Sequence, residues 1–427
     1  MNSQDRFYFY HSSIGDLTKR IHKYCEQNIL PTPGYITNAF GVKINPNFFP
    51  HILSGKEGIE EVPIPANWHA DIAEFGSVFR AVDLAKEHFT IIELGCGWGC
   101  WLNNAGIVAK RKGLSVSLVG IEGDLGHIVF AKEALCTNGF EETEFKLYHG
   151  VASAHAGTAL FPIQSQSGVS WGLEPLFNAT DEETDNLVKS GSYSCLPQIT
   201  LQSALPQRIN KIDLLHIDIQ GGEIELIPES IDFLNEHVAT MFIGTHSRQI
   251  EGELIDLLIN AGWRLEVERP AVLSIGKTVS TLVDGVQFWR NPNLISDKDA
   301  GGGHISETNG SLALKSFPKS LSCGEIFEVK IVLKNETDSV WCSYGDNPVL
   351  LSYHWLNADG SMNWYDGLRT PLACEIVYAD ETVEEVVRVQ APDKKGHYQL
   401  ILTLVQEGVC WFEDRGFTPA IIKVFII

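Results

Sequence analysis

The hydrophobic pattern of the first two thirds of the chain predicts strands that alternate with helices. Short apolar runs are typical of buried strands, and apolar residues three or four positions apart are typical of helices. Strands are expected at 89–95, 115–121, 145–151, 211–218 and 239–244. Helices are expected at 65–82, 99–112, 125–138, 222–236 and 248–261. This order predicts an α/β domain whose mostly parallel sheet has helices on both faces and binds ligands beyond the carboxyl ends of its strands.

The period of the pattern changes to two in the last third of the chain. Alternate residues are apolar in "IFEVKIVLKN" (326–335) and in "YQLILTLVQ" (398–406), and short strands of this kind between Gly, Asn and Asp turns predict an antiparallel β-sandwich. The segment "GHYQL" resembles the tyrosine corner of immunoglobulin-like domains, with Tyr398 at the start of a strand. Leu400 stands where those domains place a cysteine, which suits a reducing compartment.

The segment "DKDAGGGHISETNGS" (297–311) predicts a linker, because its glycines and small polar residues offer almost nothing to bury. We therefore expect four parts in this chain of 427 residues. They are an N-terminal extension at 1–64, an α/β domain at 65–296, the linker at 297–311 and a β-sandwich at 312–427.

Composition limits the partners and the compartment. With 54 acidic against 32 basic residues, the formal net charge is -22, which disfavours nucleic acid and anionic membrane surfaces as partners. The nine cysteines form no CxxC pair, so reduced thiols are expected rather than disulfides or a zinc site. The N-terminal residues do not resemble a secretory signal, and no apolar run reaches the length of a membrane span. We expect a cytoplasmic protein without a membrane segment.

Three glycines follow the first strand in "IIELGCGWGCW" (91–101), which contains Glu93, Gly95, Gly97 and Gly99. The spacing is too short for a dinucleotide-binding fingerprint. It resembles motif I of class I S-adenosylmethionine-dependent methyltransferases. The resemblance implies a Rossmann-like fold, close approach of bare backbone to the cofactor, and a carboxylate at Glu93 that orients the cofactor's ammonium group directly or through water.

Further cofactor contacts are expected around this loop. Glu122 ends the next strand, where an acid can accept both ribose hydroxyls. A glycine turn and an acid after a strand are each ordinary, but their register on two successive strands favours S-adenosyl-L-methionine as the cofactor. Val151 ends the third strand, where backbone groups meet the adenine edge. Trp68 either stacks on adenine or packs in the core.

A third motif resembles one family more closely. The segments "TLQSAL" (200–205) and "KIDLLHIDIQGGEIELI" (211–227) are similar to FkbM-type methyltransferases, whose usual motif is K-I-D-x-E-G-x-E, and the resemblance spans roughly 65–290. The chain departs from that motif at His216, where lysine is usual, and at Gln220, where glutamate is usual. Because the amide of Gln220 replaces the usual carboxylate, we do not expect Gln220 to act as a general base.

Asp218 is the candidate active-site carboxylate, since it shares one face of the strand with His216 and Gln220. It would orient a substrate hydroxyl or accept its proton. Glu223 opens the next helix and is equally suited to catalysis or to helix capping. His246 follows the fifth strand and is either a base that titrates near neutrality or a hydrogen-bonded loop histidine. Asp218 and His246 together could hold a divalent cation, but no third acidic ligand is evident and no metal site is predicted.

The segments "IGTHSRQIEG" (243–252) and "DGVQFWRNP" (284–292) resemble a bacterial subgroup associated with surface polysaccharides, as does the C-terminal domain. The resemblance implies an O-methyltransferase that methylates a sugar hydroxyl in surface-glycan biosynthesis, with a glycan or sugar-containing small molecule as acceptor. The alternatives are a methyltransferase for a small natural product or protein side chain, and a non-catalytic glycan-binding scaffold. The long stretch 156–198 is a candidate wall of the acceptor pocket. Trp364 and Tyr365 lie in a polar loop and either bind a glycan, by stacking on its sugar rings, or a partner, or do not take part in binding. The oligomeric state stays open.

Overall fold

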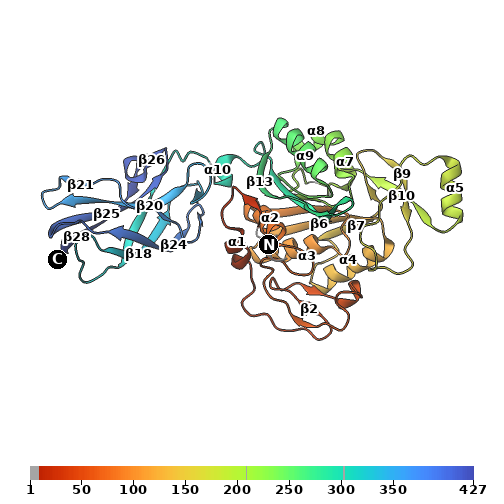
Figure 1. Ribbon diagram of the computed structural model, residues 1–427, viewed down its shortest axis with the longest axis horizontal. Helices are drawn as coiled ribbons and strands as arrows, with labels where there is room; N and C mark the ends of the chain where they lie inside the picture. Colours follow the sequence, from red (N-terminus) through yellow and green to blue (C-terminus); the bar gives the residue numbers. More distant parts are fainter. Residues whose placement is uncertain (1–8, 208, 302) are drawn as a thin grey trace. The chain divides into compact units, whose positions relative to one another are not determined.

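The computed structural model of the chain describes residues 9–207, 209–301 and 303–427. The first eight residues of the expected N-terminal extension and Gly302 of the expected linker lie outside these ranges. The described residues form two compact units (Figure 1). The first holds Asp16–Ile295 together with the described residues up to Ser12, and the second holds Ser13–Gly15 together with Ser296–Ile427.

An eight-stranded sheet organises the first unit, in the order β1-β13-β16-β12-β11-β5-β6-β7. Its strands are β1 (His11–Ser12), β5 (His88–Leu94), β6 (Ser115–Glu122), β7 (Phe145–His149), β11 (Leu214–Ile217), β12 (Thr240–Thr245), β13 (Arg264–Arg269) and β16 (Gly285–Arg290). The five strands from β12 to β7 pair in parallel, whereas β16, β13 and β1 pair antiparallel. The sheet confirms the Rossmann-like architecture that the sequence predicts.

Helices cover both faces of this sheet, with α7, α8 and α9 on one side and α2, α3 and α4 on the other (Figure 1). They are α1 (Leu17–Lys23), α2 (Ile72–Leu84), α3 (Cys100–Arg111), α4 (Leu125–Thr137), α7 (Glu223–Glu229), α8 (Ile231–His237) and α9 (Arg248–Asn260). One core cluster joins the apolar residues of β5, β6, β11 and β12 to those of α7, α8 and α9. None of the helices in the described ranges is long and apolar enough to cross a membrane.

Two of the expected helices differ from the structure. The helix expected at 222–236 is divided into α7 and α8 at Ser230, two residues after Pro228, which lacks an N–H and crowds the preceding turn. The helix expected at 65–82 begins only at Ile72, because Asp71 forms a capping box with Glu74. Trp68 and His69 therefore lie in the loop before the helix.

Smaller elements surround the sheet. The N-terminal extension contributes β2 (Ile36–Thr37), β3 (Lys43–Ile44), β4 (Gly58–Ile59) and the 3₁₀ turn η2 (Pro46–Phe48). The stretch between β7 and β11 forms β8 (Val151–Ala152), β9 (Gly157–Pro162), α5 (Asp181–Lys189), β10 (Tyr193–Ile199) and α6 (Leu201–Ala204). Strands β8, β10 and β9 pair as a separate sheet, which we call the insertion sheet. A hairpin of β14 (Val272–Ile275) and β15 (Val279–Val283) precedes β16.

The second unit is mostly β-structure, with one core between a four-stranded and a six-stranded sheet. The four-stranded sheet contains β17 (Gly310–Ser316), β18 (Ile326–Asn335), β24 (Thr382–Gln390) and β27 (Phe417–Thr418). The six-stranded sheet contains β20 (Val349–Asn357), β21 (Met362–Trp364), β22 (Thr370–Pro371), β25 (Gly396–Gln406), β26 (Cys410–Trp411) and β28 (Ala420–Ile426). The remaining elements are α10 (Asp297–Ala300), β19 (Trp341–Cys342), β23 (Ile376–Val377) and the 3₁₀ turn η3 (Phe412–Arg415).

Two details of the second unit bear on the sequence analysis. The Tyr398 hydroxyl donates to the carbonyl of Lys394 at 3.0 Å, which confirms the expected tyrosine corner. The segment 297–311 buries more than its composition suggests. Ile305 and Thr308 are buried. The backbone N–H of Ile305 donates to the side-chain oxygen of Gln406, and the hydroxyl of Thr308 donates to the backbone carbonyl of Phe412. A polar segment can pack in this way because its backbone and hydroxyl groups find hydrogen-bond partners.

Candidate functional site

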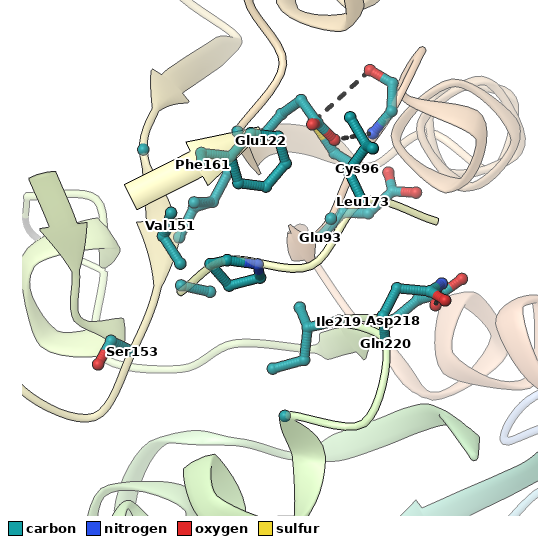
Figure 2. A pocket seen from close by; sticks show the side chains of 18 of the residues that line it. Glu93, Cys96, Glu122, Val151, Ser153, Phe161, Leu173, Asp218, Ile219 and Gln220 are labelled. Carbon is teal, nitrogen blue, oxygen red and sulfur yellow. Dashed lines mark hydrogen bonds between the residues drawn. The ribbon is translucent and has the colours of Figure 1, made fainter. Parts of the chain in front are cut away.

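The carboxyl ends of β5, β6, β11 and β12 meet at one edge of the central sheet. A cavity of about 730 Å³ opens there, bounded by the loops after β5, β6 and β11, by the insertion sheet and by the loop before α2. In Figure 2, Glu122, Phe161 and Val151 lie together at one end of the cavity, and Asp218 and Gln220 lie at the other. A volume of this size is typical of small-molecule sites.

The three glycines after β5 have different neighbours. A Cβ built on Gly95 would lie 2.1 Å from the carbonyl oxygen of Asp218, so bare backbone is needed for the loop to approach the end of β11. A Cβ on Gly97 would lie 3.0 Å from the Trp171 ring. Both glycines line the cavity, whereas Gly99 does not. Gly99 precedes α3 in a left-handed conformation, φ 75°, which glycine adopts readily at the start of a helix.

Glu93 and Glu122 hold this loop in place. The Glu93 carboxylate accepts hydrogen bonds from the backbone N–H groups of Trp101 and Leu102 in the first turn of α3, at 3.3 and 3.0 Å. Burial raises the pKa of Glu93 to about 8, and these two donors oppose the shift. The Glu122 carboxylate accepts from the N–H groups of Gly97 and Asp124, at 2.9 and 2.8 Å. Both acids line the cavity.

Asp218 follows β11 and faces the cavity with a side chain that is 45% exposed. Its Oδ1 atom lies 3.2 Å from His246 Nε2 and accepts a hydrogen bond from Gln220 Nε2 at 3.2 Å. Burial acts to raise the pKa of Asp218, but the contact with His246 and the nearby histidines outweigh it and lower the pKa. Asp218 is therefore ionised near neutrality.

His246 and Glu223 lie behind Asp218 and do not line the cavity. His246 Nδ1 is 3.2 Å from Glu223 Oε1, and its Nε2 faces Asp218. Burial acts to lower the pKa of His246, but the two carboxylates outweigh it and raise the pKa to about 10. The imidazole is thus charged at neutral pH, which is not the state of a base that titrates near neutrality.

Glu223 is fully buried, and its Oε1 atom also accepts from the Ile219 N–H at 2.9 Å. It therefore positions His246 and the turn after β11. We call the chain of contacts from Glu223 through His246 to Asp218 the carboxylate–histidine chain. Both ring nitrogens of His246 face carboxylates, so neither is turned toward a cation. Among the described residues, no cluster of three or more His, Cys, Asp or Glu side chains could hold a metal ion.

The site also contains residues that the sequence analysis did not single out as functional. Gln220 adopts a left-handed conformation, φ 57°, which is uncommon for a residue with a side chain and places its amide against Asp218. His69 lines the cavity, and burial lowers its pKa to about 4 while Asp218 opposes the shift. His216 faces Phe242 and Trp101 at ring distances of 4.7 and 6.0 Å, and burial likewise lowers its pKa to about 4.

The stretch 156–198 supplies part of the cavity wall, including Phe161, Trp171 and Leu173. The Trp171 ring stacks on His127 at 4.0 Å and on Phe49 at 4.3 Å. Phe161 covers Gly123, where an added Cβ would lie 2.4 Å from the ring. Only the unusual length of the stretch indicated these contacts, because the partner residues are distant in the sequence.

Val151 and Trp68 line the cavity as well. Val151 packs with Phe161, Ala159 and Leu196 in a small cluster at the insertion sheet. Trp68 packs edge-on against Phe49 at 4.7 Å. Val151 thus lies beside Phe161 at the Glu122 end of the cavity. Trp68 lies beside Phe49, which in turn stacks on Trp171.

Comparison with known proteins adds the family. No family model matches the chain. A protein of Jannaschia sp. (strain CCS1) described as "Putative methyltransferase" is 44% identical over 265 residues, which cover 62% of this chain and 94% of that protein. The structure of methyltransferase FkbM from Methylobacillus flagellatus KT has a TM-score of 0.31 and 12% identity, and covers 47% of this chain. The chain spans 43% of that structure.

Another solved structure, the ribosomal protein L11 methylase of Lactobacillus delbrueckii subsp. bulgaricus, has a TM-score of 0.28 and 13% identity, with coverage of 58% of this chain and 93% of that one. The identity with the Jannaschia protein, over nearly its whole length, decides the assignment. The chain therefore belongs to the S-adenosylmethionine-dependent methyltransferases.

Proposed function

We propose that this methyltransferase transfers a methyl group to a hydroxyl oxygen of a sugar, in the cytoplasmic biosynthesis of a bacterial surface glycan. The observation that carries the proposal is the Asp218 carboxylate, which faces the cavity and is held by Gln220 and His246 through one of its two oxygens. An oriented, ionised carboxylate is suited to receive the proton of a hydroxyl group.

The residues at the Glu122 end fit the cofactor. Gly97 presents bare backbone to the cavity, and each Glu122 oxygen accepts only one hydrogen bond from the described residues, which leaves capacity for a ribose hydroxyl. We assign the binding of S-adenosylmethionine to Glu93, Gly95, Gly97, Glu122 and Val151, with Phe161 and Trp68 as aromatic neighbours. When bound, the cofactor supplies an electrophilic methyl group on its sulfonium.

Asp218 performs two tasks in this proposal. It accepts a hydrogen bond from the acceptor hydroxyl, which fixes the direction of the oxygen lone pairs. It then takes the hydroxyl proton while that oxygen bonds to the methyl carbon, whose bond to the sulfonium sulfur would break and leave S-adenosylhomocysteine. Because the proton becomes more acidic as that bond forms, a carboxylate with a low pKa suffices. His246 stays protonated throughout and holds Asp218 in position, and Glu223 holds His246.

A sugar suits the lining of the cavity. The aromatic rings of Phe49 and Trp171 form one wall, and aromatic faces pack against the C–H groups of sugar rings. Polar groups of Ser153, Asn178 and Gln198 also line the cavity and can bind further hydroxyls. The motifs shared with surface-polysaccharide proteins support the same acceptor class. In the second unit, the tyrosine corner and the two facing sheets support an immunoglobulin-like domain.

The test is methyl transfer from S-adenosylmethionine to a panel of glycans and nucleotide- or lipid-linked sugars, followed by mass spectrometry. We expect one acceptor to gain the mass of one CH₂ group, and fragmentation to place the methyl on oxygen. Methylation of only a non-sugar metabolite or a protein side chain would favour the alternative acceptors. Binding of S-adenosylhomocysteine without turnover on any acceptor would favour the non-catalytic scaffold.

A further inference from the structure

The outer face of the six-stranded sheet in the second unit carries a buried polar network. Ser352 and His354 of β20 and Thr403 of β25 alternate with core residues such as Tyr353 and therefore point away from the core. All three are nevertheless less than 4% exposed. The outer face of such a sheet is ordinarily in contact with water, so its coverage here requires an explanation.

Two segments cover this face and pair with it. His354 Nε2 lies 2.6 Å from Glu413 Oε1, and the Thr403 hydroxyl donates to the other oxygen of Glu413. The other nitrogen of His354 pairs with the carbonyl of Tyr365. Arg369 donates to Ser352 Oγ at 3.1 Å and pairs with Asp366 and Glu407. A fully paired network of this kind is rigid, and it fixes the groups that rest on it.

Two aromatic rings rest on this network. The Tyr365 ring stacks on His354 at 4.5 Å with an interplanar angle of 14° and is 47% exposed. The half-buried Trp411 ring lies 4.4 Å from His354 and 5.4 Å from Tyr365, and the Arg369 guanidinium lies 5.0 Å from its centroid. Trp364, in contrast, packs against the core. Tyr365 and Trp411 thus form a rigid aromatic platform with one side in solvent.

The edge of the platform is acidic. Burial raises the pKa of Tyr365, and the nearby carboxylates of Asp414, Glu413 and Asp366 raise it further. Asp366 and Asp414 are exposed. Carboxylates beside an aromatic ring can accept hydrogen bonds from hydroxyl groups, but they repel an anionic ligand.

We propose that Tyr365 and Trp411, with Asp366, Arg369 and Asp414 at their edge, form a binding site for an uncharged sugar. The aromatic rings receive the C–H face of the sugar, and the carboxylates and the guanidinium receive its hydroxyl groups. The site belongs to the second unit and takes no part in methyl transfer. It lets the chain hold a glycan independently of the methyltransferase cavity.

The test is saturation-transfer difference NMR on the full chain with the methyl glycosides of glucose, galactose, mannose and N-acetylglucosamine. Methyl glucuronide serves as the anionic comparison. We expect ring C–H signals from at least one neutral glycoside, an affinity roughly tenfold weaker in Tyr365→Ala and in Trp411→Ala, and much weaker signals from the glucuronide. In a second arm, neutral oligosaccharides of the same sugars replace the methyl glycosides. Comparison of the two arms shows whether the site binds a sugar within a glycan chain or a single sugar.

The matched control is Phe425→Ala, which removes an exposed aromatic ring from β28 of the same sheet, 4.6 Å from His397 rather than over the polar network. We expect this variant to bind like the wild type. The exposed Asp414→Asn keeps the rings and should weaken neutral glycosides while it improves the glucuronide. It tests the site even if the aromatic variants do not fold. Signals that are equal in all variants, or absent for every neutral glycoside, would overturn the proposal.

The outcome is distinguishable from that of the proposed function. Glycoside signals that depend on Tyr365, in a protein that methylates no sugar, would support this site and contradict the sugar O-methyltransferase. Methylation of a sugar by a protein whose glycoside signals do not depend on Tyr365 or Trp411 would support the sugar O-methyltransferase and contradict this binding site. Signals that persist in both aromatic variants belong to another part of the chain and count against the platform.

Discussion

Gly95 lies directly against the backbone of Asp218, so closely that a Cβ on the glycine would be 2.1 Å from the Asp218 carbonyl oxygen. Contacts of this length do not occur for real Cβ atoms. The glycine therefore allows the loop after β5 to meet the end of β11, and it links the proposed cofactor end of the cavity to the acceptor end. The requirement for glycine at this position arises from the protein itself and would exist without a ligand.

Replacement of Gly95 by alanine should accordingly disrupt both the fold and the site. We expect Gly95→Ala to lower the free energy of unfolding by about 2–4 kcal/mol, because the backbone of Asp218 must move. Gly113→Ala is the matched control, since Gly113 also has a positive φ, 88°, but has no atom within 4 Å of an added Cβ. Urea unfolding compares the two variants, and equal losses would mean that only backbone strain is involved.

Glu122 supports the loop and, in our proposal, the cofactor. Glu122→Ala leaves the N–H groups of Gly97 and Asp124 without their acceptor and removes the group expected to bind ribose. We expect S-adenosylhomocysteine to bind about 1–3 kcal/mol more weakly in calorimetry. Glu142→Ala, which removes an exposed carboxylate that pairs with Lys132, should bind normally. An unchanged affinity in Glu122→Ala would remove Glu122 from the cofactor site.

Asp218 is the residue on which the chemistry depends. Asp218→Asn keeps the shape of the side chain but removes the proton acceptor. We expect turnover to fall by roughly 10²-fold or more, with most of the affinity for S-adenosylhomocysteine retained. Asp256→Asn, on the exposed side of α9, is the control. Full turnover in Asp218→Asn on the true acceptor would show that the proton acceptor lies elsewhere.

The charge on His246 predicts a specific dependence of stability on pH. Its pKa in the folded protein is about 10, above the ordinary value of 6.5. The stabilisation is therefore complete below pH 6.5 and is lost as the pH rises through 10. The difference in unfolding free energy between the wild type and His246→Gln should shrink from neutral to alkaline pH, as measured by urea unfolding. A difference that stays constant with pH would show that His246 is uncharged in the folded state.

The boundary between the two units is a further prediction. We expect a chain that ends at Ile295 to fold and to bind S-adenosylhomocysteine like the full chain, because all the described residues that line the cavity belong to the first unit. Calorimetry measures the affinity, and thermal unfolding measures the stability. Aggregation of the shortened chain, or loss of binding, would show that the second unit is needed for the first to fold.

The sequence predicted the central sheet well because its strands have strong local signals. A strand, a glycine turn and a helix follow one another within 25 residues at β5 and α3, and Glu122 ends the next strand in register. Asp218 lines the cavity at the end of β11, where topology led us to expect it, because strand ends in a parallel sheet meet at one edge. These inferences need only local periodicity and topology.

Other parts of the site depend on contacts between distant segments. The protonation of His246 follows from Asp218 and Glu223, which approach it from another strand end and helix. The stack of Phe49, Trp171 and His127 joins three segments that no local pattern connects. The break at Ser230 was signalled by Pro228, but the apolar pattern continued through it and indicated one helix.

The insertion sheet has a consequence for how this enzyme can diversify. It enters between β7 and β11 as a separate sheet and leaves the order of the central strands unchanged. It nevertheless supplies part of the cavity wall, including Phe161 and Trp171. Mutations, insertions or deletions within 156–198 therefore reshape the cavity wall, and changes at Phe161 or Trp171 also alter the cover over Gly123 and Gly97. The same central sheet can thus carry a cavity of a different shape when this one segment changes.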